Sequence, residues 1–174
     1  MDYMTKSTTR VQIREFAIVF RKMFSVPLSG KFPVLESLEK MHDIFPGSYY
    51  VILDDDELPV SIPAQCVVSS DGTFEIQIRQ STYQGAYEKH VGAFMDHILH
   101  EMCHIFLYKI GFTPIMERSF ENGELDPYMS SEWQAKALCG EIMMPYEETI
   151  GLTEEELVKK YGVSPSQAKY RLKY

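Results

Sequence analysis

The chain has few cysteines, no long hydrophobic run and fewer basic than acidic side chains. Cys66, Cys103 and Cys139 are odd in number and widely spaced, which predicts free thiols in a reducing compartment rather than a disulfide framework. No apolar stretch approaches the roughly 20 residues that span a bilayer. The start, Met1-Asp2-Tyr3, also lacks the basic and apolar regions of a signal peptide. These absences predict a cytoplasmic protein that does not enter a membrane.

Acidic side chains outnumber basic ones: the chain has 25 Asp and Glu and 17 Lys and Arg, which gives a formal net charge of −8. Binding to phosphate backbones requires an excess of Lys and Arg, so this balance argues against direct nucleic-acid binding. With 174 residues and 13% aromatic residues, the sequence predicts an ordered domain with a substantial core.

Chemistry is concentrated in His100-Glu101-Met102-Cys103-His104, which matches a metalloprotease signature. On a helix, two histidines four residues apart project from one face and reach the same ion. Glu101 then lies beside that ion and can serve as a general base. The alternative is that both histidines are core residues bonded to backbone groups, and the accompanying Glu101 argues against it.

The residues around the signature favour a helix from about Val91 to Ile110. Gly111 follows where a left-handed C-terminal residue is expected, and Pro114 prevents the helix from resuming. Such a helix holds both imidazoles against a rigid core. Its apolar residues recur at three- and four-residue spacing: Phe94, Ile98, Leu99, Met102, Ile105 and Phe106.

A catalytic zinc takes three protein ligands and leaves a fourth position for water. The next predicted helix runs from about Ser131 to Met144 and stops at Pro145. At roughly 100° per residue, Glu132 aligns with the edge of its apolar stripe, whereas Glu141 faces half a turn away. We therefore predict Glu132 as the third ligand, the alternative being a solvated helix-capping glutamate. Cys103 and Cys139 are disfavoured as ligands because their helices already supply His, His and Glu.

These residues resemble a known family. His-Glu-x-x-His followed, after 27 residues, by Glu132-Trp-Gln-Ala is similar to the gluzincin arrangement. The segment from Glu132 to Pro145 resembles the signature of the ImmA/IrrE metallopeptidases, which read Glu-x-x-Ala-Asn-x-Phe-Ala, then an apolar pair, Met and Pro. The resemblance covers about residues 74–172, including a helix-turn-helix-like ending. The chain departs from the family at Cys103, usually Gly, at Lys136, commonly Asn, and at His97.

The resemblance implies an intracellular zinc endopeptidase whose substrate is a helix-turn-helix transcriptional repressor. His100, His104 and Glu132 would hold one Zn²⁺, and Glu101 would move the proton. The rival function is a catalytically silent zinc-binding module that docks to a regulator; an intact Glu101 argues against it, since a structural site needs no base. Five residues are candidates for stabilising the oxyanion: Tyr83, Tyr87, Tyr128, Tyr146 and His97.

The first half of the chain predicts helices at about 8–24 and from Pro33, then strands at 49–53, 65–69 and 74–79. Asp71-Gly72 predicts a hairpin between the last two strands. In zincin-type peptidases, which this chain resembles, the strand before the zinc helix lies at the sheet edge and pairs with extended substrate. The resemblance implies that Gln77 and Arg79 flank the cleft, the alternative being an ordinary sheet strand. Tyr128 is a further candidate substrate-binding residue. The acidic run Asp54–Glu57 lacks the alternation of a calcium loop, which favours a solvated loop.

The resulting prediction is an α+β, minimal zincin-like domain over residues 1–150, with a small, mainly antiparallel sheet packed on the zinc helix. Residues 151–174 are predicted to form a helix-turn-helix-like tail packed on that domain. Lys169, Arg171 and Lys173 make its last helix basic, but Glu154-Glu155-Glu156 lies alongside in sequence. Packing or partner contact is therefore favoured over DNA recognition.

Overall fold

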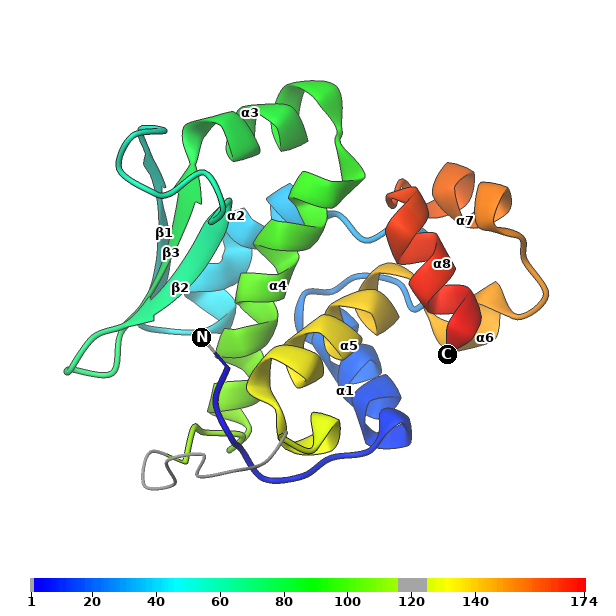
Figure 1. Cartoon of the computed structure of the whole chain (residues 1–174), viewed down its shortest axis with the longest axis horizontal. Helices are drawn as coiled ribbons and strands as arrows, with labels where there is room; N and C mark the ends of the chain where they lie inside the picture. Colours follow the sequence, from blue (N-terminus) through cyan, green and yellow to red (C-terminus); the bar gives the residue numbers. More distant parts are fainter. Residues whose placement is uncertain (1, 116–124) are drawn as a thin grey trace.

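The computed structural model describes residues 2–115 and 125–174, and over these ranges the chain is α+β, as predicted (Figure 1). The strands are β1 (Ser48–Leu53), β2 (Ala64–Val68) and β3 (Phe74–Arg79). A 3-10 turn, η1, covers Pro127–Met129. The helices are α1 (Arg10–Met23), α2 (Val34–Ile44), α3 (Gln80–Lys89), α4 (Gly92–Lys109), α5 (Ser131–Met143), α6 (Tyr146–Thr149), α7 (Glu154–Tyr161) and α8 (Pro165–Lys173).

The sheet has the strand order β1-β3-β2 and is mixed rather than mainly antiparallel. β2 and β3 form the predicted antiparallel hairpin, with Gly72 at φ +81° in the turn. β3 then lies between β2 and β1 and pairs with β1 in parallel, Ser48 opposite Phe74. The expectation of a mainly antiparallel sheet is therefore corrected. β1 pairs with β3, the second strand of the hairpin, and these two strands run in the same direction.

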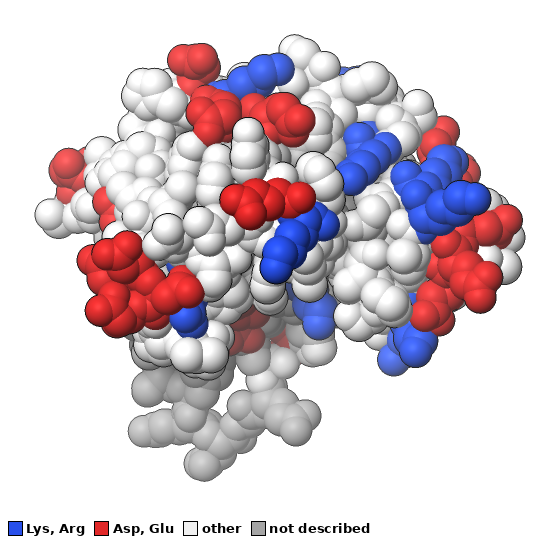
Figure 2. Space-filling view, turned by 90° about the horizontal axis from the view of Figure 1, so that it is seen from above, with Lys and Arg blue, Asp and Glu red and all other residues white. Residues whose placement is uncertain are grey.

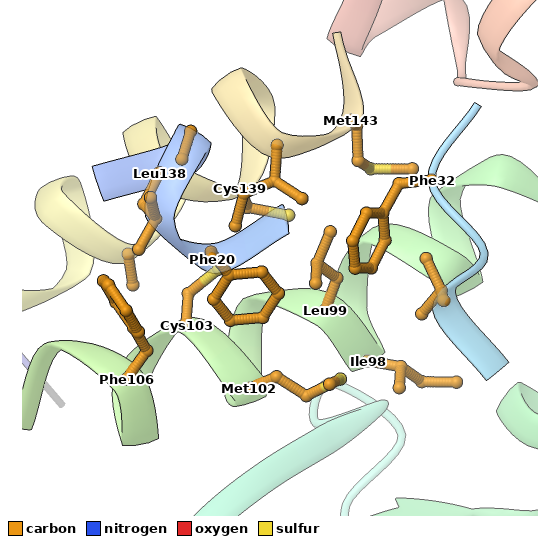
Figure 3. Packing of buried hydrophobic residues seen from close by; sticks show 14 of the residues in the cluster. Phe20, Phe32, Ile98, Leu99, Met102, Cys103, Phe106, Leu138, Cys139 and Met143 are labelled. Carbon is orange, nitrogen blue, oxygen red and sulfur yellow. The ribbon is translucent and has the colours of Figure 1, made fainter. Parts of the chain in front are cut away.

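Helix α4 lies between the sheet and the pair α1 and α5 (Figure 1). Because α4 is covered on several sides, most of its circumference is apolar and buried. Figure 3 shows Phe20 of α1 and Leu138 of α5 packed around Leu99, Cys103 and Phe106 of α4. The remaining face carries His100, Glu101 and His104, which are each only partly buried.

Helix α3 was not predicted, because its buried residues are Thr82, Gly85 and Ala86, which form no apolar stripe. It follows β3 without a loop. The acidic loop at 54–57 supplies its N-terminal acceptor, since Asp55 Oδ1 accepts a hydrogen bond of 2.9 Å from the backbone N–H of Ser81. The predicted solvated loop therefore also stabilises a helix start.

The tail helices α7 and α8 form as predicted, and each begins with a capping box. Leu157, Tyr161, Val163 and Ala168 belong to the same buried apolar cluster as α4 and α5. On the face in Figure 2, basic side chains lie beside acidic ones and form no continuous basic surface. Helices α7 and α8 therefore share the buried apolar core of the described chain.

Gly92, the first residue of α4, tests this docking. A Cβ there would lie 2.4 Å from the carbonyl oxygen of Gly162, in the turn between α7 and α8. We expect Gly92→Ala to lower the free energy of unfolding by about 1–3 kcal/mol, because backbone must move apart. Gly140→Ala in α5 is the matched control: its Cβ meets nothing within 4 Å, so it should be neutral or stabilising. Equal values for the two variants in denaturant unfolding would contradict the described packing of the tail.

Candidate metal centre and catalytic cleft

His100 and His104 present their imidazoles together on the open face of α4. Their Nε2 atoms are 3.0 Å apart and their ring centroids 4.7 Å apart. The side chains are 20% and 22% exposed, so the helix holds them firmly while leaving the nitrogens accessible. The one-face geometry predicted from four-residue spacing is therefore present.

Glu132 reaches the same point from α5, which crosses beside α4. Ser130 caps α5 by accepting a hydrogen bond of 2.9 Å from the backbone N–H of Trp133, and this places Glu132 in the first turn. Its Oε2 lies 3.2 Å from His100 Nε2, and its Oε1 lies 3.5 Å from His104 Nε2. Hydrogen bonds with the two histidines lower the pKa of the Glu132 carboxyl. Glu141 faces the opposite side, as predicted.

The three donor atoms fit a small divalent cation. Zinc binds nitrogen and carboxylate oxygen at about 2.0–2.1 Å, and tetrahedral angles then put neighbouring donors roughly 3.3 Å apart. The observed separations of 3.0, 3.2 and 3.5 Å bracket that value. Among the described residues, His100, His104 and Glu132 are the grouping of metal-binding side chains with this convergence.

Glu101 lies behind this group, against strand β2. The pKa of its carboxyl is raised to about 7, chiefly by burial and also by the charge of Glu132, while His100 and the backbone N–H of Cys66 oppose the shift. The N–H of Cys66 donates a hydrogen bond to the carboxyl, so the edge of β2 orients Glu101. Glu101 is therefore a proton-accepting group fixed next to the candidate ligands.

A cleft of about 600 Å³ opens over these residues. One wall is formed by residues 61–66, which lead into and include the start of β2, and the floor by α4. Residues around Phe112 and the first turn of α5 complete it. Tyr3 and Tyr108 also line the cleft. Neither was predicted, because neither lies in a recognisable sequence motif.

The structure contradicts the expectation that Gln77 and Arg79 flank this cleft. β3 is the central strand, and the strand at the edge beside the cleft is β2. Gln77 instead hydrogen bonds to the side chains of Gln65 and Glu75 on the sheet's other face. Arg79 lies 3.5 Å from Asp55 in an ion pair. Neither side chain belongs to the described cleft lining.

Tyr128 is also outside the cleft lining, in η1, with its ring 5.0 Å from that of Trp133. Of the oxyanion candidates, His97 lines the cleft. The three remaining tyrosine candidates lie elsewhere. Tyr83 stacks between Tyr50 and Tyr87, and the ring of Tyr146 packs against the guanidinium of Arg14. These ring contacts indicate that the tyrosines contribute to packing of the fold.

Comparison with known proteins gives a structural and a family likeness. A transcriptional regulator of Mycobacterium tuberculosis aligns with 94% of this chain at 16% sequence identity and a TM-score of 0.42. The chain spans about half of that structure, 51% of its length. No curated protein matches the sequence. In the part of the chain that the structure describes, no helix is long and apolar enough to cross a membrane.

The family likeness covers the candidate site. Residues 89–173 match the peptidase family model described as the IrrE N-terminal-like domain. The match includes α4, with His100, Glu101 and His104, and α5, with Glu132, and it continues through the tail. The resemblance to the ImmA/IrrE metallopeptidases is thereby confirmed over residues 89–173.

Proposed function

We propose that this chain is a cytoplasmic, zinc-dependent endopeptidase that cleaves a helix-turn-helix transcriptional repressor. The observation that carries the proposal is the convergence of His100, His104 and Glu132 beside a partly buried Glu101 in an open cleft. The family match over residues 89–173 supports peptidase activity. The repressor substrate follows from the resemblance of residues 74–172 to the ImmA/IrrE peptidases.

In this proposal His100, His104 and Glu132 hold the ion. Zinc held there would supply Lewis-acid chemistry that makes water more acidic. Glu101 accepts a proton from the attacking water and returns it to the leaving amine as the peptide C–N bond breaks. The N–H of Cys66 keeps the Glu101 carboxyl directed at the cleft. His97 is the candidate donor to the developing oxyanion, because it lines the cleft.

The substrate segment is expected to lie extended along β2 rather than β3. One edge of β2 pairs with β3, and residues 64–66 of the same strand line the cleft. Pairing of main chains at a sheet edge gives affinity without fixing side-chain identity. Residues 1–150 then form the metallopeptidase domain, and residues 151–174 form the tail packed on it.

Metal analysis of purified protein tests the ligand set. We expect the wild-type chain to bind a single zinc ion and Glu132→Ala to bind it more than about a hundredfold more weakly, since loss of an outer-shell partner alone costs 10–100-fold. Glu155→Ala, an exposed first-turn glutamate of α7, is the matched control and should bind zinc normally. Zinc retained by Glu132→Ala would exclude the proposed site. Zinc bound without cleavage of any repressor would favour the silent binding module.

A further inference from the structure

The segment at residues 2–8, here called the N-terminal strap, lies across the start of α5. Its backbone forms an antiparallel bridge between Met4 and Ser130. The N–H of Thr5 donates to the carbonyl of Met129 at 2.8 Å, and the N–H of Ser131 donates to the carbonyl of Tyr3 at 2.9 Å. The strap is therefore paired with the residues that immediately precede Glu132.

A buried amide fixes the strap in place. Gln134 of α5 is fully buried, and its Nε2 donates to the carbonyls of Lys6 at 2.9 Å and Tyr128 at 2.8 Å. Its Oε1 accepts a hydrogen bond of 3.0 Å from Thr5 Oγ1. On the other side, the N–H of Ile115 donates to the carbonyl of Met4 at 2.7 Å. A buried and satisfied polar network of this kind specifies one position for the strap.

Asp2, which precedes this paired region, binds the first turn of α5 directly. Its Oδ1 accepts hydrogen bonds from the backbone N–H of Glu132 at 3.1 Å and from Ser131 Oγ at 3.2 Å. Its Oδ2 accepts one of 2.6 Å from Ser130 Oγ. The start of α5 thus has two caps: Ser130 satisfies the N–H of Trp133, and Asp2 satisfies the N–H of Glu132.

The residue that Asp2 holds is the candidate metal ligand of α5. The Glu132 side chain is 44% exposed, so packing alone restrains it weakly. A carboxylate at a helix N-terminus is also favoured by the helix dipole. Outer-shell groups that orient a ligand typically change metal affinity by about 10–100-fold. Asp2 acts through the backbone of the ligand, so a smaller effect is expected.

We propose that Asp2 is a positioning residue that fixes the first turn of α5 and thereby holds the Glu132 carboxylate at the metal centre. The inference rests on the proposed function, since it assumes that Glu132 binds zinc. It extends the site to a segment of the chain more than a hundred residues away in sequence, which the family match at residues 89–173 does not include. Tyr3 of the same strap lines the cleft, so the strap forms part of the site wall.

The test compares zinc affinity across variants of the full chain, measured by competition with a chromogenic chelator. Asp2→Ala is expected to bind zinc about three- to tenfold more weakly than wild type. Asp2→Asn keeps an acceptor for the Glu132 N–H and should stay within about twofold of wild type. Asp2 is exposed, so its substitution should leave the fold intact, which circular dichroism checks.

Thr153→Ala is the matched control, because it removes the helix cap of α7, away from the cleft. It is expected to lower the melting temperature with zinc affinity unchanged. The visible spectrum of the cobalt-substituted protein gives a second readout: Asp2→Ala should change its bands, and Thr153→Ala should not. A purely structural role for Asp2 would move only the melting temperature.

These measurements distinguish failure of the positioning role of Asp2 from failure of the proposed ligand set. If Glu132→Ala abolishes zinc binding but Asp2→Ala binds zinc like wild type, the positioning role is wrong and the proposed function survives. The same holds if Asp2→Asn is as weak as Asp2→Ala, because the hydrogen bond to Glu132 would then not be responsible. If Glu132→Ala itself binds zinc normally, the proposed ligand set fails first.

Discussion

Replacing Glu101 with glutamine is expected to reduce peptide cleavage by about 10²–10⁴-fold, the usual contribution of a general acid or base, while zinc remains bound. Glutamine keeps the size of the side chain and can still accept from the N–H of Cys66. It cannot accept the proton that the attacking water gives up. His100, His104 and Glu132 are untouched, so the metal centre should persist.

The measurement is cleavage of a purified helix-turn-helix repressor, followed by gel electrophoresis, with zinc content determined on the same preparation. Glu75→Gln is a suitable control, since this carboxylate lies on the sheet face away from α4 and bonds to Gln77. It should cleave at the wild-type rate. Undiminished cleavage by Glu101→Gln would reject Glu101 as the base.

Removal of the Glu141 carboxylate is expected to lower the free energy of unfolding by about 3–5 kcal/mol, because it leaves buried positive charge without a partner. Glu141 of α5 is 1% exposed. Its Oε1 accepts from Arg171 Nη1 of α8 at 2.8 Å and from Arg14 Nε of α1 at 3.4 Å. Arg171 is itself only 4% exposed. This ion pair therefore joins the tail to the body of the protein.

Denaturant unfolding of Glu141→Ala measures the effect. The control is Glu154→Ala, which removes an ion pair between α7 and α8 that also involves the tail. Glu154 and Lys169 are 3.9 Å apart and much more exposed, at 36% and 69%, so the loss should stay below about 1 kcal/mol. Similar losses in the two variants would show that the buried cluster does not secure α8.

Much of the candidate site follows from local sequence pattern. Four-residue spacing puts His100 and His104 on one face of a helix whatever the rest of the chain does. The apolar stripe of α5 separates Glu132 from Glu141, and the structure has them on opposite sides as expected. Asp71-Gly72 likewise specifies the hairpin between β2 and β3, because the turn is set by the residues within it.

Which segments pair with each strand or pack against each helix is decided only in the folded protein. The sequence shows that β3 is a strand, but its position between β1 and β2 depends on pairing between residues far apart in the chain. For that reason the prediction that Gln77 and Arg79 of β3 flank the cleft is wrong, and residues of β2 line it instead. The arginine partners of the buried Glu141 were likewise not predictable, since Arg14 and Arg171 lie at opposite ends of the sequence.

Sequence by itself determined the two elements that carry the candidate site and the residues in them that can do chemistry: a helix with two histidines and a glutamate, and a second helix that offers a carboxylate. Tertiary structure decided which groups surround them, including Cys66 beside Glu101 and Asp2 beside Glu132. The physical reason is that helical and strand periodicity are local properties, repeated every few residues. Contacts between distant segments depend instead on how complete faces pack together, and no short pattern encodes that choice.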